Sequence, residues 1–185
     1  MGMGSNIELM ILDWIQSIRT PVGDAVMCFI TKLGDAGIIW IVLAAILLLI
    51  PKTRKHGLVM MAALCIDLVV CNGLLKNLFA RIRPCDVNTQ IQLLIARPDD
   101  FSFPSGHTAA SFAAVAALYF SGERKLWKPA LLLACFIAFS RLYLYVHYPT
   151  DILGGILVGI AAGYAGSIII QQVMKWNEKR HSMKK

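Results

Sequence analysis

Three cationic side chains, Lys76, Arg83 and Arg141, lie at or near the ends of long apolar segments, where a charge is costly. Between them in the chain, Ser105 and Gly106 precede another apolar run and are typical of the start of a helix. The free N–H groups of a helix N-terminus bind anions, and the planar guanidinium of arginine suits the oxygens of phosphate. Together these residues predict a pocket for a dianionic phosphate group.

Two histidines and one aspartate could carry out chemistry on such a phosphate. Asp151 follows His147 by four residues, so its carboxylate can hold one imidazole nitrogen while the other attacks phosphorus. His107 stands in the first turn of the predicted helix, where it can protonate the leaving oxygen and later activate a water molecule. We therefore expect covalent catalysis, with His147 as nucleophile, Asp151 as its orienting partner and His107 as general acid.

The same pocket argues against metal catalysis. Three cations repel a divalent metal ion, and the set contains one carboxylate, whereas metal-dependent phosphatases supply several oxygen ligands. We expect no metal and no other cofactor.

The composition places this chemistry in a membrane. Of the 185 residues, 57% are hydrophobic and 16% are charged, and the mean hydropathy of +0.64 is too high for a soluble domain of this size. We expect residues 1–185 to form a single membrane-embedded domain, an all-α bundle with five to six transmembrane helices. The candidate spans are residues 36–51, 57–79, 105–120, 128–145 and 150–175. Residues 1–35 are predicted to be either amphipathic helices at the interface, broken near Pro21, or the first transmembrane segment.

The basic residues predict the orientation. They gather in three short segments, residues 52–55, 124–128 and 175–185, which would share one side of a five-span chain. The positive-inside rule makes that side the cytoplasm, so residues 176–185 form a basic cytoplasmic tail and the predicted site faces outward. The net charge of +7 is thus a topology signal, and we expect no nucleic-acid partner.

Other features predict packing and accessory roles. Alanines and glycines that recur every four residues predict close helix contacts, at Ala109, Ala113, Ala117, Gly155, Gly159 and Gly163. Lys76 and Arg83 would share a helix face if the second span continued past Phe79. Asp67 is interpreted as a protonated acid bonded to a neighbouring helix, with a proton relay or a substrate contact as the alternatives. Arg81 is expected to snorkel or to contact lipid headgroups, and the loop over residues 81–104 to be a lid or binding loop.

The pattern resembles a known family. Lys76 with Arg83-Pro84, then Pro104-Ser105-Gly106-His107, then Ser140-Arg141 with His147 and Asp151 are similar to the three-part signature of the type 2 phosphatidic acid phosphatases. The resemblance covers residues 76–151, the expected catalytic core. It implies a six-helix, metal-independent membrane phosphatase with an acid phosphatase/vanadium haloperoxidase-like core. It also implies that the phosphate is held by Lys76, Arg83, Ser105, Gly106 and Arg141, with the catalytic roles given above.

The expected reaction is hydrolysis of a phosphate monoester or diphosphate of a membrane lipid, through a phosphohistidine, at the extracytoplasmic face of the plasma membrane. The partners are thus the bilayer and a lipid phosphate. Among family substrates, undecaprenyl diphosphate is ranked first, and phosphatidylglycerol phosphate or phosphatidic acid is the alternative. Other possibilities are phosphoryl transfer to an acceptor, vanadate-dependent oxidation as in the related haloperoxidases, and lipid binding or transport without turnover.

Overall fold

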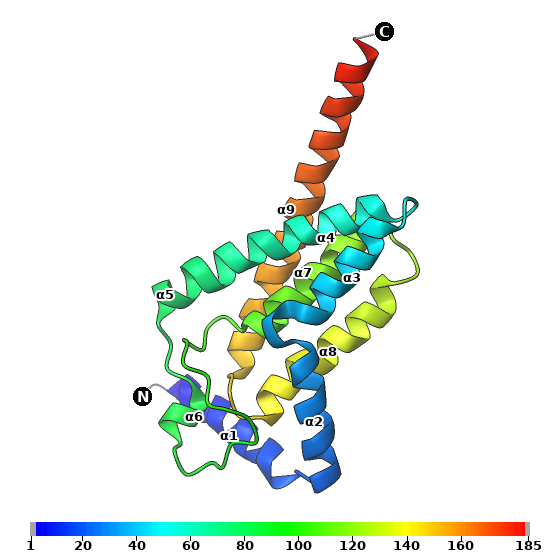
Figure 1. Ribbon diagram of the computed structural model, residues 1–185. Helices are drawn as coiled ribbons and strands as arrows, with labels where there is room; N and C mark the ends of the chain where they lie inside the picture. The colour runs from blue at the N-terminus through cyan, green and yellow to red at the C-terminus, as the bar shows by residue number, and fades with distance from the viewer. Residues whose placement is uncertain (1–2, 184–185) are drawn as a thin grey trace.

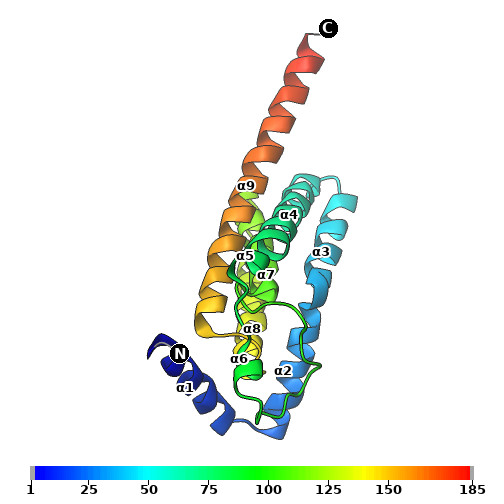
Figure 2. The ribbon, with the colours of Figure 1, turned by 90° about the vertical axis from the view of Figure 1, so that its left-hand side faces the viewer.

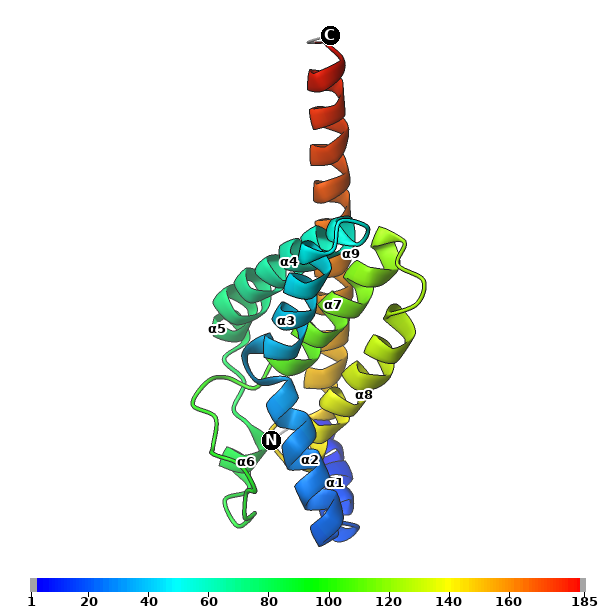
Figure 3. The same cartoon turned by 45° about the vertical axis from the view of Figure 1, so that its right-hand side comes forward.

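The computed structural model describes residues 3–183, in which every regular element is a helix (Figure 1). Helix α7 (Gly106–Ser121) lies at the centre, and most of its side chains are buried. It is surrounded by α9 (Pro149–Ser182), α4 (Arg54–Asp67) and α8 (Trp127–Tyr143), as Figure 3 shows. The apolar core of the bundle therefore forms around the helix that the Ser105-Gly106 sequence begins.

Small residues bring α7 and α9 into close contact. A Cβ atom added to Gly159 would collide with the backbone carbonyl of Ala109, and one added to Gly163 would collide with the Cβ of Ala116. Ala109 and Ala113 of α7 are fully buried in this contact. The prediction that small residues let these helices approach closely is confirmed.

Helix α4 continues without a break through a π-helical segment, η2 (Leu68–Leu75), into α5 (Lys76–Phe79). The helix ends there because Ala80 takes up a left-handed backbone conformation, with φ of 43°. Arg83 lies beyond this end, in extended backbone just before the short helix α6 (Pro84–Val87). Because the helix does not continue past Phe79, Lys76 and Arg83 do not share a helix face, although a loop brings the two side chains together.

The N-terminal segment forms two helices, α1 (Met3–Ser17) and α2 (Pro21–Leu33), and Pro21 begins the second after the expected break. In helix α1, Leu12 and Ile15 are buried, whereas the apolar side chains of Met10 and Trp14 are largely exposed, so this helix leaves apolar surface outside the bundle. A short 3₁₀ turn, η1 (Asp35–Gly37), then leads into the apolar helix α3 (Ile38–Leu49). The chain bends by 45° between the α2 segment and the segment from Asp35 to Leu49.

The number of candidate membrane spans is smaller than expected. By length and composition, two helical segments within residues 3–183 could cross a membrane, Arg54–Val87 and Pro149–Arg180. A third is gained if the bent pair Pro21–Leu33 and Asp35–Leu49 counts as one span. The prediction of five to six spans is therefore not met: α7 and α8 have 16 and 17 residues. At a rise of 1.5 Å per residue, such helices are somewhat shorter than a hydrocarbon core of about 30 Å.

The two ends of the bundle differ in content (Figures 1 and 2). The α3–α4 connection, the α7–α8 connection and the C-terminal part of α9 lie toward one end, whereas α1, α2, α6 and the start of α9 lie toward the other. The three basic segments thus share an end of the molecule, as the orientation argument requires. Lys184 and Lys185 of the predicted basic tail lie outside the described residues.

Candidate active site

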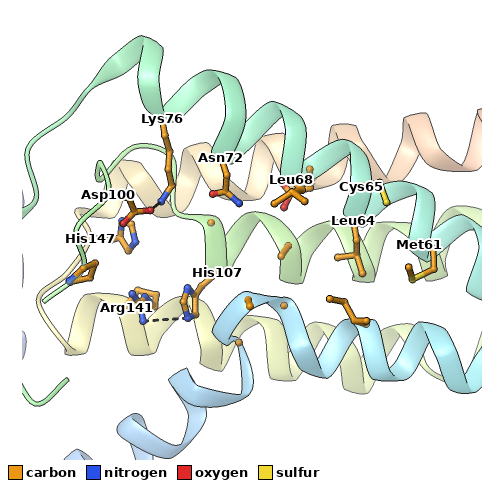
Figure 4. A pocket seen from close by; sticks show the side chains of 18 of the residues that line it. Met61, Leu64, Cys65, Leu68, Asn72, Lys76, Asp100, His107, Arg141 and His147 are labelled. Atoms are coloured by element: carbon orange, nitrogen blue, oxygen red, sulfur yellow. Dashed lines mark hydrogen bonds and ion pairs between the residues drawn. The ribbon is translucent and has the colours of Figure 1, made fainter. Parts of the chain in front are cut away.

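A cavity of about 360 Å³ lies between α3, the α4–η2–α5 helix and the start of α7. One half of it is polar and is lined by Lys76, Arg83, Asp100, His107, Arg141 and His147. The other half is mostly apolar and runs along the helices past Leu68, Leu64 and Met61, with Asp67 as a polar member of its lining (Figure 4). The cavity therefore joins a cluster of cations and histidines to a groove that suits a hydrocarbon chain.

His147 lies in the turn between α8 and α9 and is 1% exposed. Its Nδ1 atom lies 3.4 Å from Oδ2 of Asp151, in the first turn of α9. Its Nε2 atom lies on the other side of the ring, 3.1 Å from Nη1 of Arg83. Burial, followed by the nearby cations of Arg83 and Arg141, holds the pKa of His147 well below its usual value. The imidazole is therefore neutral, the state that a nucleophile requires.

Asp151 is fully buried and held by several donors. The backbone N–H of Tyr148 donates to its Oδ2 atom at 2.8 Å, and the Ser102 hydroxyl donates to the same oxygen at 2.5 Å. The Ser102 hydroxyl also lies 3.5 Å from Nδ1 of His147. The carboxylate thus presents to the imidazole an oxygen that is fixed by its neighbours.

Arg83 and Lys76 share one carboxylate, that of Asp100 in the loop before α7. Arg83 is 2% exposed and also donates to the carbonyls of Val146 at 2.7 Å and Asp100 at 2.8 Å. Burial raises the pKa of Asp100, but the pairing with Lys76 and Arg83 outweighs it and lowers this pKa to about 2. The two predicted phosphate-binding cations thus hold an anion that belongs to the chain itself.

His107 and Arg141 form the opposite wall of the cavity (Figure 4). Nε2 of His107 lies 2.9 Å from Oδ1 of Asp35 and 3.5 Å from Nη1 of Arg141. Arg141 is 3% exposed, and the same Nη1 donates to the hydroxyl of Thr31 at 2.5 Å. Its buried Nε atom has no hydrogen-bond partner among the described residues. This wall therefore offers the N–H donor of Arg141 Nε and the imidazole of His107, which has the carboxylate of Asp35 as its partner.

Ser105 and Gly106 lie where the sequence predicts, at the start of α7. Ser105 is the N-cap residue, but its side chain makes no capping hydrogen bond and its hydroxyl accepts one from Thr108 at 3.0 Å. Gly106 lines the cavity, and a Cβ atom there would lie 3.0 Å from the side-chain oxygen of Asn72. Of the eight predicted site residues, six line the cavity: Lys76, Arg83, Gly106, His107, Arg141 and His147. Ser105 and Asp151 lie directly behind them, paired through the Ser105 N–H and the Asp151 carbonyl at 3.1 Å.

Two interpretations from the sequence need correction. Asp67 is 2% exposed and lines the cavity, and its Oδ1 atom has no partner within residues 3–183 instead of the expected bond to a neighbouring helix. Arg81 neither snorkels nor is free for headgroups, because it forms ion pairs with Asp151 and Glu8 at 2.6 Å each. Lipid contact was predicted because Arg81 is a long cationic side chain near a membrane span. In the fold, two carboxylates lie within reach of its guanidinium and bind it instead.

Several contacts could not be found by sequence reasoning. Asp35 and Thr31 come from the N-terminal third, outside the motif, and Asp100 is one of several acidic residues in a long loop. The one available signal was the length of that loop, which predicted a binding role without indicating a residue.

Comparisons with known proteins identify the family of the chain. Residues 52–176 match the model of the PAP2 superfamily. The chain is 31% identical over 158 residues to an undecaprenyl-diphosphatase of Sulfolobus acidocaldarius, covering 85% of this chain and 75% of that protein. It is 33% identical over 152 residues to the undecaprenyl-diphosphatase BcrC of Bacillus subtilis, covering 80% of this chain and 75% of that protein.

Solved structures agree on the fold. A transmembrane PAP2-type phosphatidylglycerolphosphate phosphatase from Bacillus subtilis superposes with a TM-score of 0.76 at 26% identity, covering 94% of this chain and 89% of that one. A bacterial vanadium-dependent iodoperoxidase has a TM-score of 0.73 at 20% identity, covering 89% of this chain and 49% of that one, and so shares the fold. The all-α, PAP2/vanadium haloperoxidase-like fold is therefore confirmed. The chain belongs to the PAP2 superfamily and is a membrane-embedded lipid phosphatase.

Proposed function

We propose that this phosphatase hydrolyses undecaprenyl diphosphate to undecaprenyl phosphate and inorganic phosphate, without a metal ion. The observation that carries the proposal is the continuous cavity, whose cationic half holds His147 and whose other half is an apolar groove. A diphosphate on a long isoprenoid chain matches both halves. We assign the catalytic core to residues 76–151.

The proposed chemistry has two steps. Nε2 of His147 attacks the terminal phosphorus, the bond from that phosphorus to the bridging oxygen breaks, and His107 gives its proton to the oxygen that leaves. The phosphoryl group is then bound to His147 as a phosphohistidine. A water molecule that His107 deprotonates attacks this phosphorus, the P–N bond breaks, and inorganic phosphate is released.

The charges in the cavity support these steps. Lys76, Arg83 and Arg141 would stabilise the negative charge on the transferring phosphoryl oxygens. Nη1 of Arg83 lies 3.1 Å from Nε2 of His147. If a phosphoryl oxygen of the substrate accepted the hydrogen bond from this N–H, the lone pair on Nε2 would be free to attack. Asp151, at 3.4 Å from Nδ1, would stabilise the positive charge that the ring gains.

The relatives support a prenyl diphosphate as the substrate, because two of them carry the name undecaprenyl-diphosphatase. A glycerolipid phosphate, such as phosphatidylglycerol phosphate or phosphatidic acid, is the second candidate. The structural likeness to a phosphatidylglycerolphosphate phosphatase favours it. Because the family covers both, a direct comparison of substrates decides between them.

We further propose that the protein lies in the plasma membrane with the cavity open to the extracytoplasmic side. Three basic segments at one end of the bundle support this orientation.

The test is phosphate release by the purified protein in detergent with EDTA present. Undecaprenyl diphosphate, phosphatidylglycerol phosphate and phosphatidic acid are compared at equal concentration. We expect the highest kcat/KM on undecaprenyl diphosphate, inhibition by vanadate, and a loss of roughly 10³-fold or more in His147→Asn. A requirement for added Mg²⁺ would contradict the mechanism, and preference for a glycerolipid would contradict the substrate. Binding of these lipids without release of phosphate would favour a transport protein.

A further inference from the structure

The carboxylate of Asp151 uses its two oxygens for different partners. Oδ2 lies toward His147 and accepts the bonds from Tyr148 and Ser102. Oδ1 accepts a bond from Nη1 of Arg81 at 2.6 Å. The orientation of the carboxylate that faces the nucleophile is thus also set by a residue outside the cavity.

Arg81 is in turn held on three sides. Its Nη2 donates to Oε2 of Glu8 at 2.6 Å, and Nη1 also donates to the hydroxyl of Thr150 at 2.7 Å. The guanidinium lies over the ring of Tyr148, 4.0 Å from its centroid. A planar guanidinium with this many contacts has one available orientation, so it can fix the carboxylate that it binds.

Glu8 comes from helix α1, far from Asp151 in the sequence and outside residues 52–176 of the family match. Its side chain is 12% exposed, and its Oε1 atom accepts from both the N–H and the hydroxyl of Thr150, at 3.0 and 2.6 Å. Glu8 therefore ties α1 both to Arg81 and to the first turn of α9, the turn that carries Asp151.

Charge explains why both residues are needed. A guanidinium paired with Asp151 alone would neutralise part of the negative charge with which Asp151 stabilises the imidazole of His147. Glu8 shares the guanidinium, so that the order of charges from α1 to the nucleophile is negative, positive, negative. Buried ion pairs that lose one member leave an uncompensated charge behind, so each residue depends on the others.

We infer that Arg81 is a positioning residue for the Asp151–His147 pair, and that Glu8 of the N-terminal helix acts through it. This inference rests on the proposed role of His147 as nucleophile. Neither residue lines the cavity, so both affect the chemical step and leave substrate binding unchanged.

The test uses the full chain and compares kcat and KM on the best lipid phosphate for Arg81→Met, Arg81→Lys, Glu8→Gln and the Arg81→Met/Glu8→Gln double variant. We expect Arg81→Met to lower kcat by roughly 10- to 100-fold, because the carboxylate that orients His147 loses the donor that fixes it, with KM within about twofold. Arg81→Lys should recover part of this loss. The double variant should be no worse than Arg81→Met, because Glu8 acts through Arg81.

The control is Arg19→Met, which removes an ion pair of similar length, Arg19–Asp24 at 2.9 Å, from the same N-terminal helices without touching Asp151. We expect it to keep full activity. If Arg81→Met does not fold, Arg81→Lys and Glu8→Gln decide. A normal kcat in these variants, or a rise in KM alone, would overturn the inference, and so would equal losses in the Arg19 control. Activity that survives in His147→Asn would instead defeat the proposed function.

Discussion

Asp100 offers the sharpest test of how the site receives its substrate. Its carboxylate is bonded to both Lys76 and Arg83, the cations that we propose for the phosphate. A substrate that uses both cations must compete with this carboxylate. We therefore predict that Asp100→Asn, which removes the charge and keeps the shape, tightens the binding of phosphate.

The magnitude follows from the electrostatics. The pKa of Asp100 falls from an ordinary 3.8 to about 2, and at 1.36 kcal/mol per pH unit this corresponds to about 2.5 kcal/mol. About half of the side chain is exposed, at 53%, so solvent screening reduces the interaction to about 1–1.5 kcal/mol. We expect KM for the lipid, and the inhibition constant of vanadate, to fall by about five- to tenfold.

The pH dependence gives the prediction a second readout. Because the folded-state pKa of Asp100 is depressed, its ion pairs contribute fully above about pH 4 and are lost only as the pH falls toward 2. The gain in Asp100→Asn should therefore be constant between pH 5 and 9.

The assay is steady-state phosphate release with vanadate inhibition, and Asp99→Asn is the matched control in the same exposed part of the loop. An unchanged or higher KM in Asp100→Asn would refute the reasoning, since it would mean that the carboxylate orients the cations and does not compete for them.

Three further predictions test other parts of the account. Asp35→Asn should lower kcat by roughly tenfold at unchanged KM, because Oδ1 of Asp35 lies 2.9 Å from the imidazole of His107; an unchanged kcat would deny it a role. Gly163→Val should cost roughly 1–3 kcal/mol of stability and lower the Tm, whereas Ala161→Val on the exposed side of α9 should not; equal Tm values would contradict the close packing. His147 has a pKa well below 6.5, so below that pH the unfolded chain binds a proton there that the folded chain does not; the Tm should therefore fall less between pH 7 and 5 in His147→Asn than in the wild type.

Sequence reasoning could find the residues that form a pattern along the chain. Lys76, Arg83, His107 and His147 were found because the order of charges, histidines and helix starts is itself a signal. The small residues of α7 and α9 were found because a four-residue repeat maps onto one helix face. These features depend on local geometry.

Contacts that depend on how distant segments meet were missed. Asp35 reaches His107 only because the chain bends between α2 and α3, and Glu8 reaches Arg81 only because α1 packs against α8, close to the first turn of α9. The end of the long helix at Phe79 agrees with the predicted span of residues 57–79, although the positive φ of Ala80, which ends it, gives no sequence signal. The span count failed because hydropathy marks apolar residues but not the length of the helix that they form.

The most direct test of the central claim is to trap the covalent intermediate. Protein mixed with undecaprenyl diphosphate labelled in its terminal phosphate is quenched in base within one turnover, digested and analysed by mass spectrometry. We predict a phosphate on the peptide that contains His147, and none in His147→Asn. Label on His107, or full turnover with no labelled histidine at any quench time, would contradict the mechanism.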